Sequence, residues 1–462
     1  MGVVAHASRT RLEDLGGSLN HGRLLTDPDV VESYRLDRAS WESTGSPLAV
    51  VIAADAGDVV ATLRWASEHR VPVVPRGSGT SLAGGASAIE GCIVLSLASM
   101  DRIVELAPAE RLAVVEPGVI TADLDRAARA HGLMYAPDPS SYAICTIGGN
   151  LATNAGGLRC LKYGVTRDSA LGLEVVLASG SLIRTGRRTA KGVTGYDLTG
   201  LFIGSEGTLG VITSAVVRLR PAPRTPPVTV AATFGALPAA VEAASMLTRE
   251  GVDLALLELM DRTTLAAIED WKHTGIGSNA AAMLIAQADG PLPDAAASRV
   301  GAVCEQAGAT DVAVATNEFE SDQLIELRRL AYPATERLGA CLVEDVCVPV
   351  PRLTALITRI EEIGAAHRVT IATVAHAGDG NVHPVFVYDR ALKEPPAQVW
   401  AAADDVFGAA LALGGTLTGE HGVGAIKTKW IGAELGAESH VAHRTVKAAF
   451  DPLGILNPGR AI

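Results

Sequence analysis

Three glycine-rich segments in the first half of the chain constrain its fold more than any other feature. They are PRGSGTSLAGGA at 75–86, PDPSSYAICTIGGNLATNAGGLRCLKYG at 137–164 and TGYDLTGLFIGSEGTLGVIT at 194–213. Glycine lets the main chain take conformations closed to other residues and approach a ligand closely. One such segment is ordinarily a wide turn, but three together favour a ligand-binding role. The first matches neither GxGxxG nor a P-loop, because its spacing differs and no GK[ST] follows.

Short apolar runs and helical patterns alternate around these segments. Strands are expected at 71–74, 92–97, 112–116 and 173–179, where β-branched and apolar residues cluster. Helices are expected at 58–69 and 121–132, the second with Thr121 as N-cap and Gly132 beyond its end. This half of the chain is therefore predicted to be α+β or α/β, with many glycine turns.

A proline-rich stretch divides the chain. RLRPAPRTPPV at 218–228 suits a linker, because proline fixes φ and removes a backbone donor. Beyond it, helices are expected near 236–250, 353–367 and 396–415, the last with Gly414 and Gly415 ending it. The predicted domains are an N-terminal helical segment (1–45), a ligand-binding domain (46–224), a cap domain (225–415) and a C-terminal segment (416–462).

Composition excludes several classes of protein. Hydrophobic residues make up 48% of the chain and charged residues 19%, as in a globular protein with a substantial core. The net charge of -12 argues against nucleic acid or an anionic membrane as the main partner. The six cysteines form no CxxC pair, the start shows no signal-peptide pattern, and no run of about 18 apolar residues occurs. We expect a cytoplasmic protein without a transmembrane segment, and attachment to a membrane through a partner stays open.

Two short motifs in the second half carry side chains suited to metal binding. HAGDGNVHP at 376–384 places His376 and His383 on either side of Gly-Asp-Gly-Asn, a strong turn pattern. TGEHGVG at 418–424 adds Glu420 and His421. Two histidines and one carboxylate leave coordination positions open, as in catalytic rather than structural sites. Zinc is the first candidate, and iron and manganese also accept this ligand set.

The neighbours Glu420 and His421 are expected to have different roles. Adjacent residues in extended chain point in opposite directions, so both should not bind one metal. With Glu420 as the ligand, His421 is available as a general base near neutral pH. Single histidines are usually structural, and this interpretation is applied to the others: His6, His21, His69, His131, His273, His367, His440 and His443.

The glycine-rich segments resemble the FAD-binding domain of the vanillyl-alcohol oxidase and p-cresol methylhydroxylase fold. The resemblance implies an α+β protein with a two-subdomain FAD-binding domain, an α+β cap (substrate) domain and a C-terminal helical return segment. It also implies which residues line the cofactor: Pro75, Arg76, Gly77, Ser78, Gly79, Thr80, Ser81, Gly84, Pro139, Ser140, Thr146, Gly148, Gly149, Asn150, Asn154, Gly156, Gly157, Tyr163, Glu206, Gly207, Gly210, Ile212 and Asn457. Some members hold FAD covalently through a histidine in the first loop. Thr80 and Ser81 stand there, so non-covalent FAD is expected.

The motifs HAGDGNVHP and GEHGVG are similar to those of the FAD-linked 2-hydroxy acid dehydrogenases of that fold. This branch includes D-lactate dehydrogenases, the glycolate oxidase flavin subunit and D-2-hydroxyglutarate dehydrogenase. The resemblance covers nearly the whole chain and places the metal on His376, His383 and Glu420 and the base on His421. The resemblance adds three substrate-binding residues: Arg328 for the carboxylate, Asn381 and Tyr332.

One departure from the family pattern concerns substrate size. Hydroxyglutarate-type members carry a lysine where this chain has Val343, so a monocarboxylate such as D-lactate or glycolate is favoured. Three alternatives stay open: D-2-hydroxyglutarate as substrate, a non-catalytic FAD scaffold subunit, and non-redox alkyl transfer on the same fold. The acceptor (quinone, cytochrome, electron-transfer flavoprotein or iron–sulfur subunit) and a homodimer are left open too.

Overall fold

The structure, a computed structural model, describes residues 12–39, 45–189, 191–275 and 280–462. Its chain divides into two compact units. The first unit comprises Met1–Ala155, Val165–Ala222 and Glu420–Ile462, and the second comprises Gly156–Gly164 and Pro223–Gly419. Residues 1–11 and 40–44 of the predicted N-terminal segment lie outside the described residues, whereas residues 12–18 of that segment are helical.

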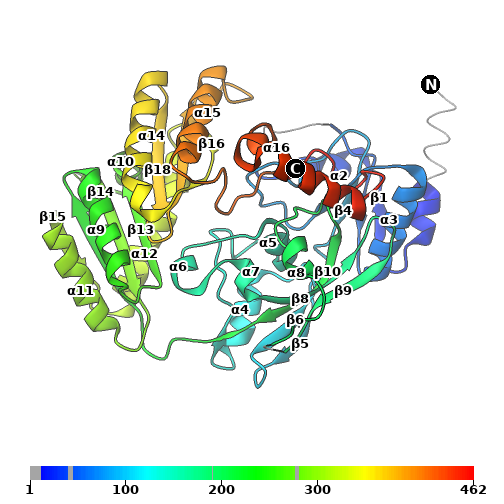
Figure 1. The fold of residues 1–462 in the computed structure, drawn as a ribbon, viewed down its shortest axis with the longest axis horizontal. Coiled ribbons are helices and arrows are strands. Elements are labelled where there is room, and N and C mark those ends of the chain that lie inside the picture. The colour runs from blue at the N-terminus through cyan, green and yellow to red at the C-terminus, as the bar shows by residue number, and fades with distance from the viewer. Residues whose placement is uncertain (1–11, 40–44, 190, 276–279) are drawn as a thin grey trace. The chain divides into compact units, whose positions relative to one another are not determined.

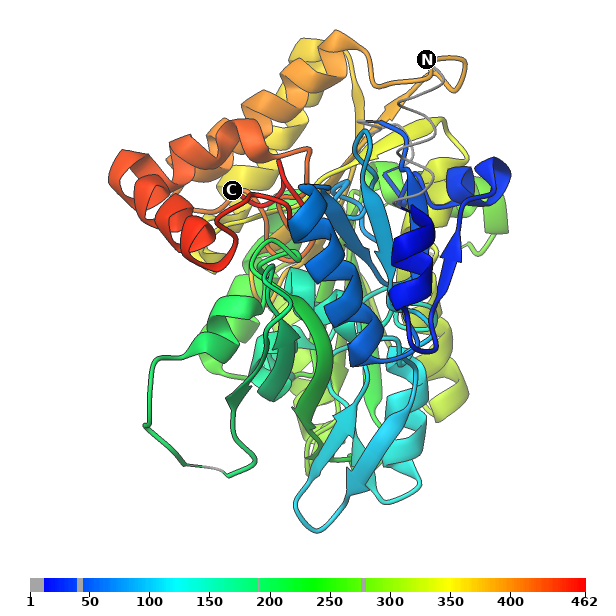
Figure 2. The same ribbon diagram turned by 90° about the vertical axis from the view of Figure 1, so that its right-hand side faces the viewer.

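A four-stranded sheet begins the first unit. Its order is β1 (Arg23–Leu25), β2 (Ala49–Ile52), β4 (Ile93–Ser96) and β3 (Val73–Arg76). The last three strands run parallel, and β1 pairs with β2 antiparallel. The predicted helix is α3 (Ala56–His69), whose Val59 and Leu63 are fully buried in one core with the sheet. Figure 2 shows α3 lying across these strands.

A five-stranded antiparallel sheet follows in the same unit. Its order is β5 (Ile103–Ala107), β6 (Leu112–Val115), β10 (Val211–Arg218), β8 (Ala170–Val176) and β9 (Leu182–Gly186). The short strands β7 (Leu133–Met134) and β11 (Arg220–Pro221) pair separately. The remaining helices are α2 (Pro28–Ser33), α4 (Thr121–Arg129), α5 (Ile147–Thr153), α7 (Thr166–Ser169) and α8 (Leu198–Phe202).

The N-cap expected for α4 is wrong. Ile120 occupies that position and has no capping side chain. The hydroxyl of Thr121 instead accepts a hydrogen bond from Asn150 Nδ2 at 2.8 Å, so it joins α4 to α5. A hydroxyl can serve either purpose, and the tertiary neighbour was not visible in the local pattern.

The C-terminal segment returns to the first unit. Helix α16 (Ile431–Phe450) is interrupted at Gly436, where φ is 72°. The Phe450 ring meets Phe202 edge-on at 5.4 Å. Lys447 Nζ donates to the carbonyl oxygens of Thr208 and Leu456 and to Asp451 Oδ2. The predicted return of the C-terminus onto this unit is thus made by packing and by the half-buried ammonium group of Lys447.

An eight-stranded antiparallel sheet forms the centre of the second unit (Figure 1). Its order is β15 (Ala309–Val314), β12 (Val228–Phe234), β14 (Ala282–Ala288), β13 (Leu256–Asp261), β18 (Thr370–His376), β19 (Asn381–Tyr388) and β16 (Ala340–Val343), with β17 (Val346–Cys347) also paired to β19. The segment α6 (Cys160–Tyr163) belongs to this unit.

Helices pack on both faces of this sheet. One layer contains α10 (Arg262–Lys272), α12 (Glu318–Arg329) and α13 (Ala331–Glu336), which share a core with strand residues such as Met260 and Val374. The other layer contains α9 (Leu237–Glu250), α11 (Pro293–Gln306), α14 (Leu353–His367) and α15 (Ala397–Ala412). Helix α15, expected near 396–415, buries Val399, Ala403, Val406, Phe407 and Ala410, whose spacing in the sequence is that of one helical face.

Two further observations concern the cysteines and the helices of the described residues. All six cysteines are free, so no disulfide framework is present. No helix in the described part of the chain combines the length and the low polarity that a bilayer crossing requires.

Candidate functional site

The loop after β3 offers a row of backbone donors. Among the described residues, the N–H groups of residues 77–81 donate to no other protein group. Gly79 has a φ of 73°, a conformation that favours glycine. Arg76 is held inside the loop, with Nη1 donating to Ala86 O at 3.2 Å. Consecutive N–H groups without protein acceptors suit an anionic group such as a diphosphate.

The three glycine-rich segments meet in the first unit. A Cβ added to Gly77 would lie 2.4 Å from Thr146 Oγ1, and one added to Gly207 would lie 3.0 Å from Pro75 Cγ. Asn457 Nδ2 donates to the carbonyl oxygens of Gly85 and Glu206. Residues far apart in sequence are therefore neighbours, and a side chain at Gly77 or Gly207 would collide with the side chain of another segment.

Several polar side chains predicted to face the cofactor have protein partners instead. Thr146 caps α5 by accepting from Gly149 N at 3.3 Å, and Asn150 binds Thr121 as described above. Asn154 ends α5 in the left-handed conformation and accepts from Arg167 N at 2.9 Å. Tyr163 lies in the second unit with Gly156 and Gly157, and its hydroxyl donates to Asp289 Oδ2 at 2.5 Å. The main chain of these residues and the ring of Tyr163 stay candidates for cofactor contact.

Glu206 is a buried carboxylate that holds the GEHGVG segment. Its two oxygens accept from the backbone N–H groups of Val423 and Gly424, each at 2.8 Å. Burial raises the pKa of Glu206 to about 7, although these two hydrogen bonds oppose the rise. Glu206 therefore fixes the chain just beyond Glu420 and His421.

The β18–β19 hairpin brings the two histidines of the first motif together. The predicted turn occupies residues 377–380, between His376 at the end of β18 and Asn381 at the start of β19. His376 pairs with Asn381, and His383 pairs with Val374 on the same face of the sheet. The imidazole centroids of His376 and His383 are 5.0 Å apart and nearly perpendicular.

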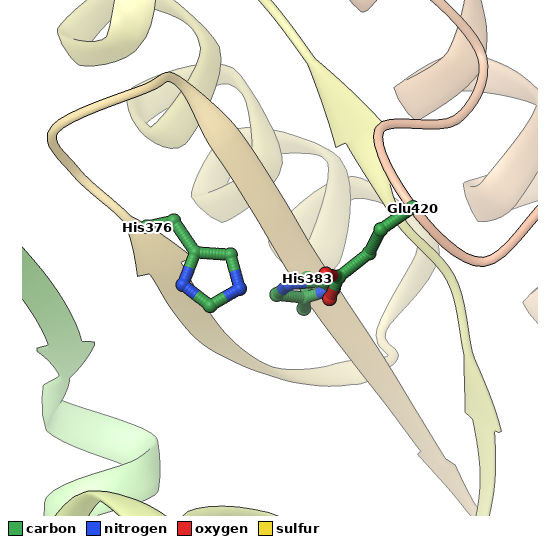
Figure 3. A group of neighbouring side chains, drawn as sticks. All are labelled: His376, His383 and Glu420. Atoms are coloured by element: carbon green, nitrogen blue, oxygen red, sulfur yellow. The ribbon is translucent and has the colours of Figure 1, made fainter. Parts of the chain in front are cut away.

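Glu420 completes a group that could hold a metal ion. His376, His383 and Glu420 each offer a ligand atom, and these atoms lie within 4.8 Å of one another. Figure 3 shows the Glu420 carboxylate directed toward the His383 ring. Ligand atoms in a tetrahedral site with bonds of about 2.1 Å are about 3.4 Å apart, so side-chain rotations would have to bring these three atoms closer to bind one ion. The donor set of two imidazoles and one carboxylate fits a divalent metal with open positions.

The expected divergence of Glu420 and His421 does not occur. Residues 419–421 form a bend rather than extended chain. As a result Glu420 Oε1 and His421 Nε2 are only 3.9 Å apart. The alternation of side chains applies to extended backbone alone, and it was applied here to a segment with two flanking glycines.

A further buried carboxylate, Glu258, was missed by the sequence analysis. It lies on β13, paired with His376 across the sheet, and its Oε1 is 2.7 Å from His376 Nδ1. Its Oε2 accepts from Arg328 Nε at 2.8 Å. Burial raises the pKa of Glu258, but the charges of His376 and Arg328 outweigh it and lower the pKa overall. A lone acid within the apolar run LALLELM was the available signal, because a buried charge needs partners.

A second carboxylate that the sequence analysis missed, Asp345, binds the two residues that precede Glu420. The fully buried Asp345 accepts from Thr418 Oγ1 at 2.9 Å and from Gly419 N at 2.7 Å. A Cβ on Gly419 would lie 2.5 Å from the Asn381 side chain, so the chain passes directly over it. Asn381 Oδ1 is buried and has no hydrogen-bond partner among the described residues. An unmet acceptor beside the candidate metal group is consistent with a ligand binding there.

The other predicted substrate residues lie in the same unit. Val343 pairs with Val385 across β16 and β19, so its side chain shares a face with that of His383. Arg328 ends α12 and is 7% exposed, and Tyr332 follows on α13. The structure thus gathers Arg328, Asn381 and Val343 on the sheet face that carries the histidines.

Comparison with known proteins identifies the family. The model for the C-terminal domain of FAD linked oxidases matches residues 225–461, and an FAD binding domain model matches residues 47–186. The first match covers more than half of the chain. The chain belongs to the FAD-linked oxidases and is an FAD-dependent oxidoreductase.

Individual members of that family are similar to this chain over most of its length. The chain is 43% identical over 444 residues to "Glycolate oxidase subunit GlcD" of Bacillus subtilis (strain 168), covering 96% of this chain and 92% of the relative. It is 35% identical over 417 residues to a D-lactate dehydrogenase of Archaeoglobus fulgidus, covering 89% and 91%. A p-cresol methylhydroxylase structure superposes with a TM-score of 0.81 at 19% identity, covering 98% and 96%. The last comparison confirms the predicted fold.

Proposed function

We propose that the protein oxidises a small 2-hydroxy acid, D-lactate or glycolate, to the 2-oxo acid, using FAD and a divalent metal. The observation that carries this proposal is the pair of bonds made by Glu258. The buried Glu258 carboxylate binds both His376, a candidate metal ligand, and Arg328, so that these two groups lie near one face of the sheet. A 2-hydroxy acid needs both, because its hydroxyl must be activated and its carboxylate must be bound.

The chain's own residues divide this work. The Arg328 guanidinium pairs with the substrate carboxylate, since its fork matches two oxygens, while Asn381 and Tyr332 contact the substrate. His421 removes the hydroxyl proton as general base. A bound divalent cation on His376, His383 and Glu420, zinc first and manganese or iron otherwise, supplies the Lewis acidity that makes this proton easier to remove. When bound, FAD supplies the acceptor for the hydride that leaves the α-carbon of the substrate.

The 76–81 loop supports a dissociable flavin. It contains no histidine to which a flavin could be joined. Its free backbone donors suit a diphosphate instead. Denaturation should release FAD into the supernatant, and flavin that stays with the denatured chain would contradict this part of the proposal.

Substrate size and partners follow from separate observations. Val343 offers no charge to a second carboxylate on its face of the sheet, which favours a monocarboxylate over D-2-hydroxyglutarate. The relatives named above are a glycolate oxidase subunit and a D-lactate dehydrogenase. Because the first is named as a subunit, we propose that a partner subunit or another redox protein takes the electrons from this chain.

Anaerobic mixing tests the proposal directly. The purified flavoprotein is mixed with D-lactate, L-lactate, glycolate and D-2-hydroxyglutarate, and loss of the oxidised flavin absorbance is followed. D-lactate or glycolate should bleach the flavin, and removal of the metal by a chelator should abolish bleaching while FAD is retained. A protein that no 2-hydroxy acid bleaches is a scaffold or a non-redox enzyme, and full activity after complete metal removal would exclude the metal.

A further inference from the structure

Glu258 lies between two groups that would otherwise repel each other. Its side chain is 1% exposed, and that of Arg328 is 8% exposed. His376, on the neighbouring strand, is one of the three residues that could hold a divalent cation. A guanidinium and a divalent cation on one buried face are both positive, and low polarity strengthens their repulsion. A carboxylate that touches both sides offsets this repulsion.

The hydrogen bonds also fix two orientations. An ionised carboxylate only accepts, so the nitrogen of His376 that faces Glu258, Nδ1, must carry the hydrogen. The lone pair of His376 is then on Nε2, the nitrogen that would bind a metal. On the other oxygen, the bond from Arg328 Nε holds one edge of the guanidinium and leaves its two terminal nitrogens for a ligand.

We infer that Glu258 is the positioning residue of this site: it selects the metal-binding tautomer of His376, orients Arg328, and lets a cation and a guanidinium occupy one face. This inference rests on the proposed metal and substrate roles of His376 and Arg328. It assigns to Glu258 no contact with the substrate.

Glutamine and aspartate cannot replace Glu258 in this role. Both partners of Glu258 are donors, but glutamine has one accepting oxygen and one donating NH₂ group. In Glu258→Gln, one partner therefore meets a donor and must turn away. Glu258→Asp keeps the charge but draws the carboxylate back by one methylene, so it cannot reach His376 and Arg328 together.

The test measures metal binding and substrate binding separately on the flavin-loaded protein. Glu258→Gln, Glu258→Asp and wild type are demetallated and titrated with Zn²⁺ in competition with a chromogenic chelator. KM and kcat for the best 2-hydroxy acid are measured after saturation with Zn²⁺. Asp261→Asn is the matched control, because Asp261 is a buried carboxyl on the same strand that caps α10 and accepts from Thr373 N.

We expect Glu258→Gln to weaken Zn²⁺ binding by about 10–100-fold, the usual cost of losing a partner of a metal-bound histidine. KM should rise even at saturating Zn²⁺, since Arg328 is no longer held. If Glu258→Gln fails to fold, Glu258→Asp, which keeps the charge, should still fold. It should show the weaker Zn²⁺ binding and the higher KM in milder form. Asp261→Asn should lose thermal stability while keeping the Zn²⁺ affinity of the wild type.

Three outcomes would contradict the inference. If the folded Glu258 variants bind Zn²⁺ as wild type does with unchanged KM, Glu258 is not a positioning residue, and the proposed function survives. If Asp261→Asn weakens Zn²⁺ binding equally, the effect is general destabilisation. A wild-type protein that takes up no Zn²⁺ and no Mn²⁺ overturns the proposed metal site, and the inference with it.

Discussion

The two units build their candidate sites from different parts of the chain. In the first unit the donors are backbone N–H groups, and glycines allow the three segments to touch. In the second unit the groups are the imidazole, carboxylate and guanidinium side chains of His376, Glu258 and Arg328, which lie on or against one sheet. The buried glutamates repeat this difference: Glu206 binds two backbone N–H groups, whereas Glu258 binds an imidazole and a guanidinium side chain.

The difference teaches where each site is vulnerable. A backbone-built site should tolerate side-chain truncation but suffer from an added methyl group. A side-chain-built site should fail when a single functional group is removed, even if the backbone stays in place. The pKa values of the two glutamates are also shifted in opposite directions. Burial raises the pKa of Glu206, whereas the neighbouring charges lower that of Glu258.

The largest effect is expected from the adjacent residues Glu420 and His421. His421→Ala should keep metal and FAD but reduce its flavin about 10²–10⁴-fold more slowly, a loss of roughly 3–5 kcal/mol. Glu420→Ala should lose metal first. Stopped-flow absorbance and elemental analysis of both variants separate the roles. If His421→Ala loses the metal and Glu420→Ala keeps it, the two roles are exchanged. The test is needed because the two side chains are only 3.9 Å apart.

The next effect concerns the pH dependence that Glu206 gives to folding. Its pKa is raised from 4.5 to about 7, so the folded state holds the proton more tightly than the unfolded state. The stability it contributes is present below about pH 4.5 and lost as pH rises through about 7, a change of about 3 kcal/mol. Relative to wild type, Glu206→Gln should therefore gain stability from pH 5 to pH 8 in denaturant titrations. A pH-independent difference would contradict this account of Glu206.

A smaller effect is expected from adding one methyl group to the backbone-built site. In Gly148→Ala the new Cβ would lie 2.5 Å from Pro117 Cβ, so the start of α5 must move. We expect a loss of about 1–3 kcal/mol in stability and weaker FAD retention on a desalting column. Gly432→Ala is the control, since nothing lies within 4 Å of its added Cβ. Equal FAD retention in both variants would show that the contact with Pro117 does not matter.

The smallest effect tests the side-chain site by addition. Val343→Lys places an ammonium on the sheet face of His383. We expect kcat/KM for D-2-hydroxyglutarate to rise about fivefold relative to D-lactate, or about 1 kcal/mol, the upper end of the range for an exposed charge pair. Val343→Met is the size-matched control. A wild-type preference for D-2-hydroxyglutarate would mean that another cation reads the second carboxylate.

Local patterns predicted the regular elements well. The periodicity of 353–367 and 396–415 corresponds to α14 and α15 within a few residues, because an apolar stripe is buried whichever partner it meets. The strand expected at 71–74 begins at Val73, since Val71 N–H is used to end α3. The N-cap role of Thr121 and the opposite orientation of the Glu420 and His421 side chains were predicted wrongly, because a hydroxyl partner and a bend depend on residues elsewhere in the chain.

The sequence alone determined the fold family, the presence of an FAD-binding domain and the residue types of the candidate metal site, since the glycine-rich segments and the two histidine motifs are local. Only the tertiary structure decided which of these residues meet. It joined Glu206 to the GEHGVG segment and placed Glu258 between His376 and Arg328. The physical reason is that a buried carboxylate needs partners, and these come from segments distant in sequence: sheet register brings His376 to Glu258, and the packing of α12 brings Arg328.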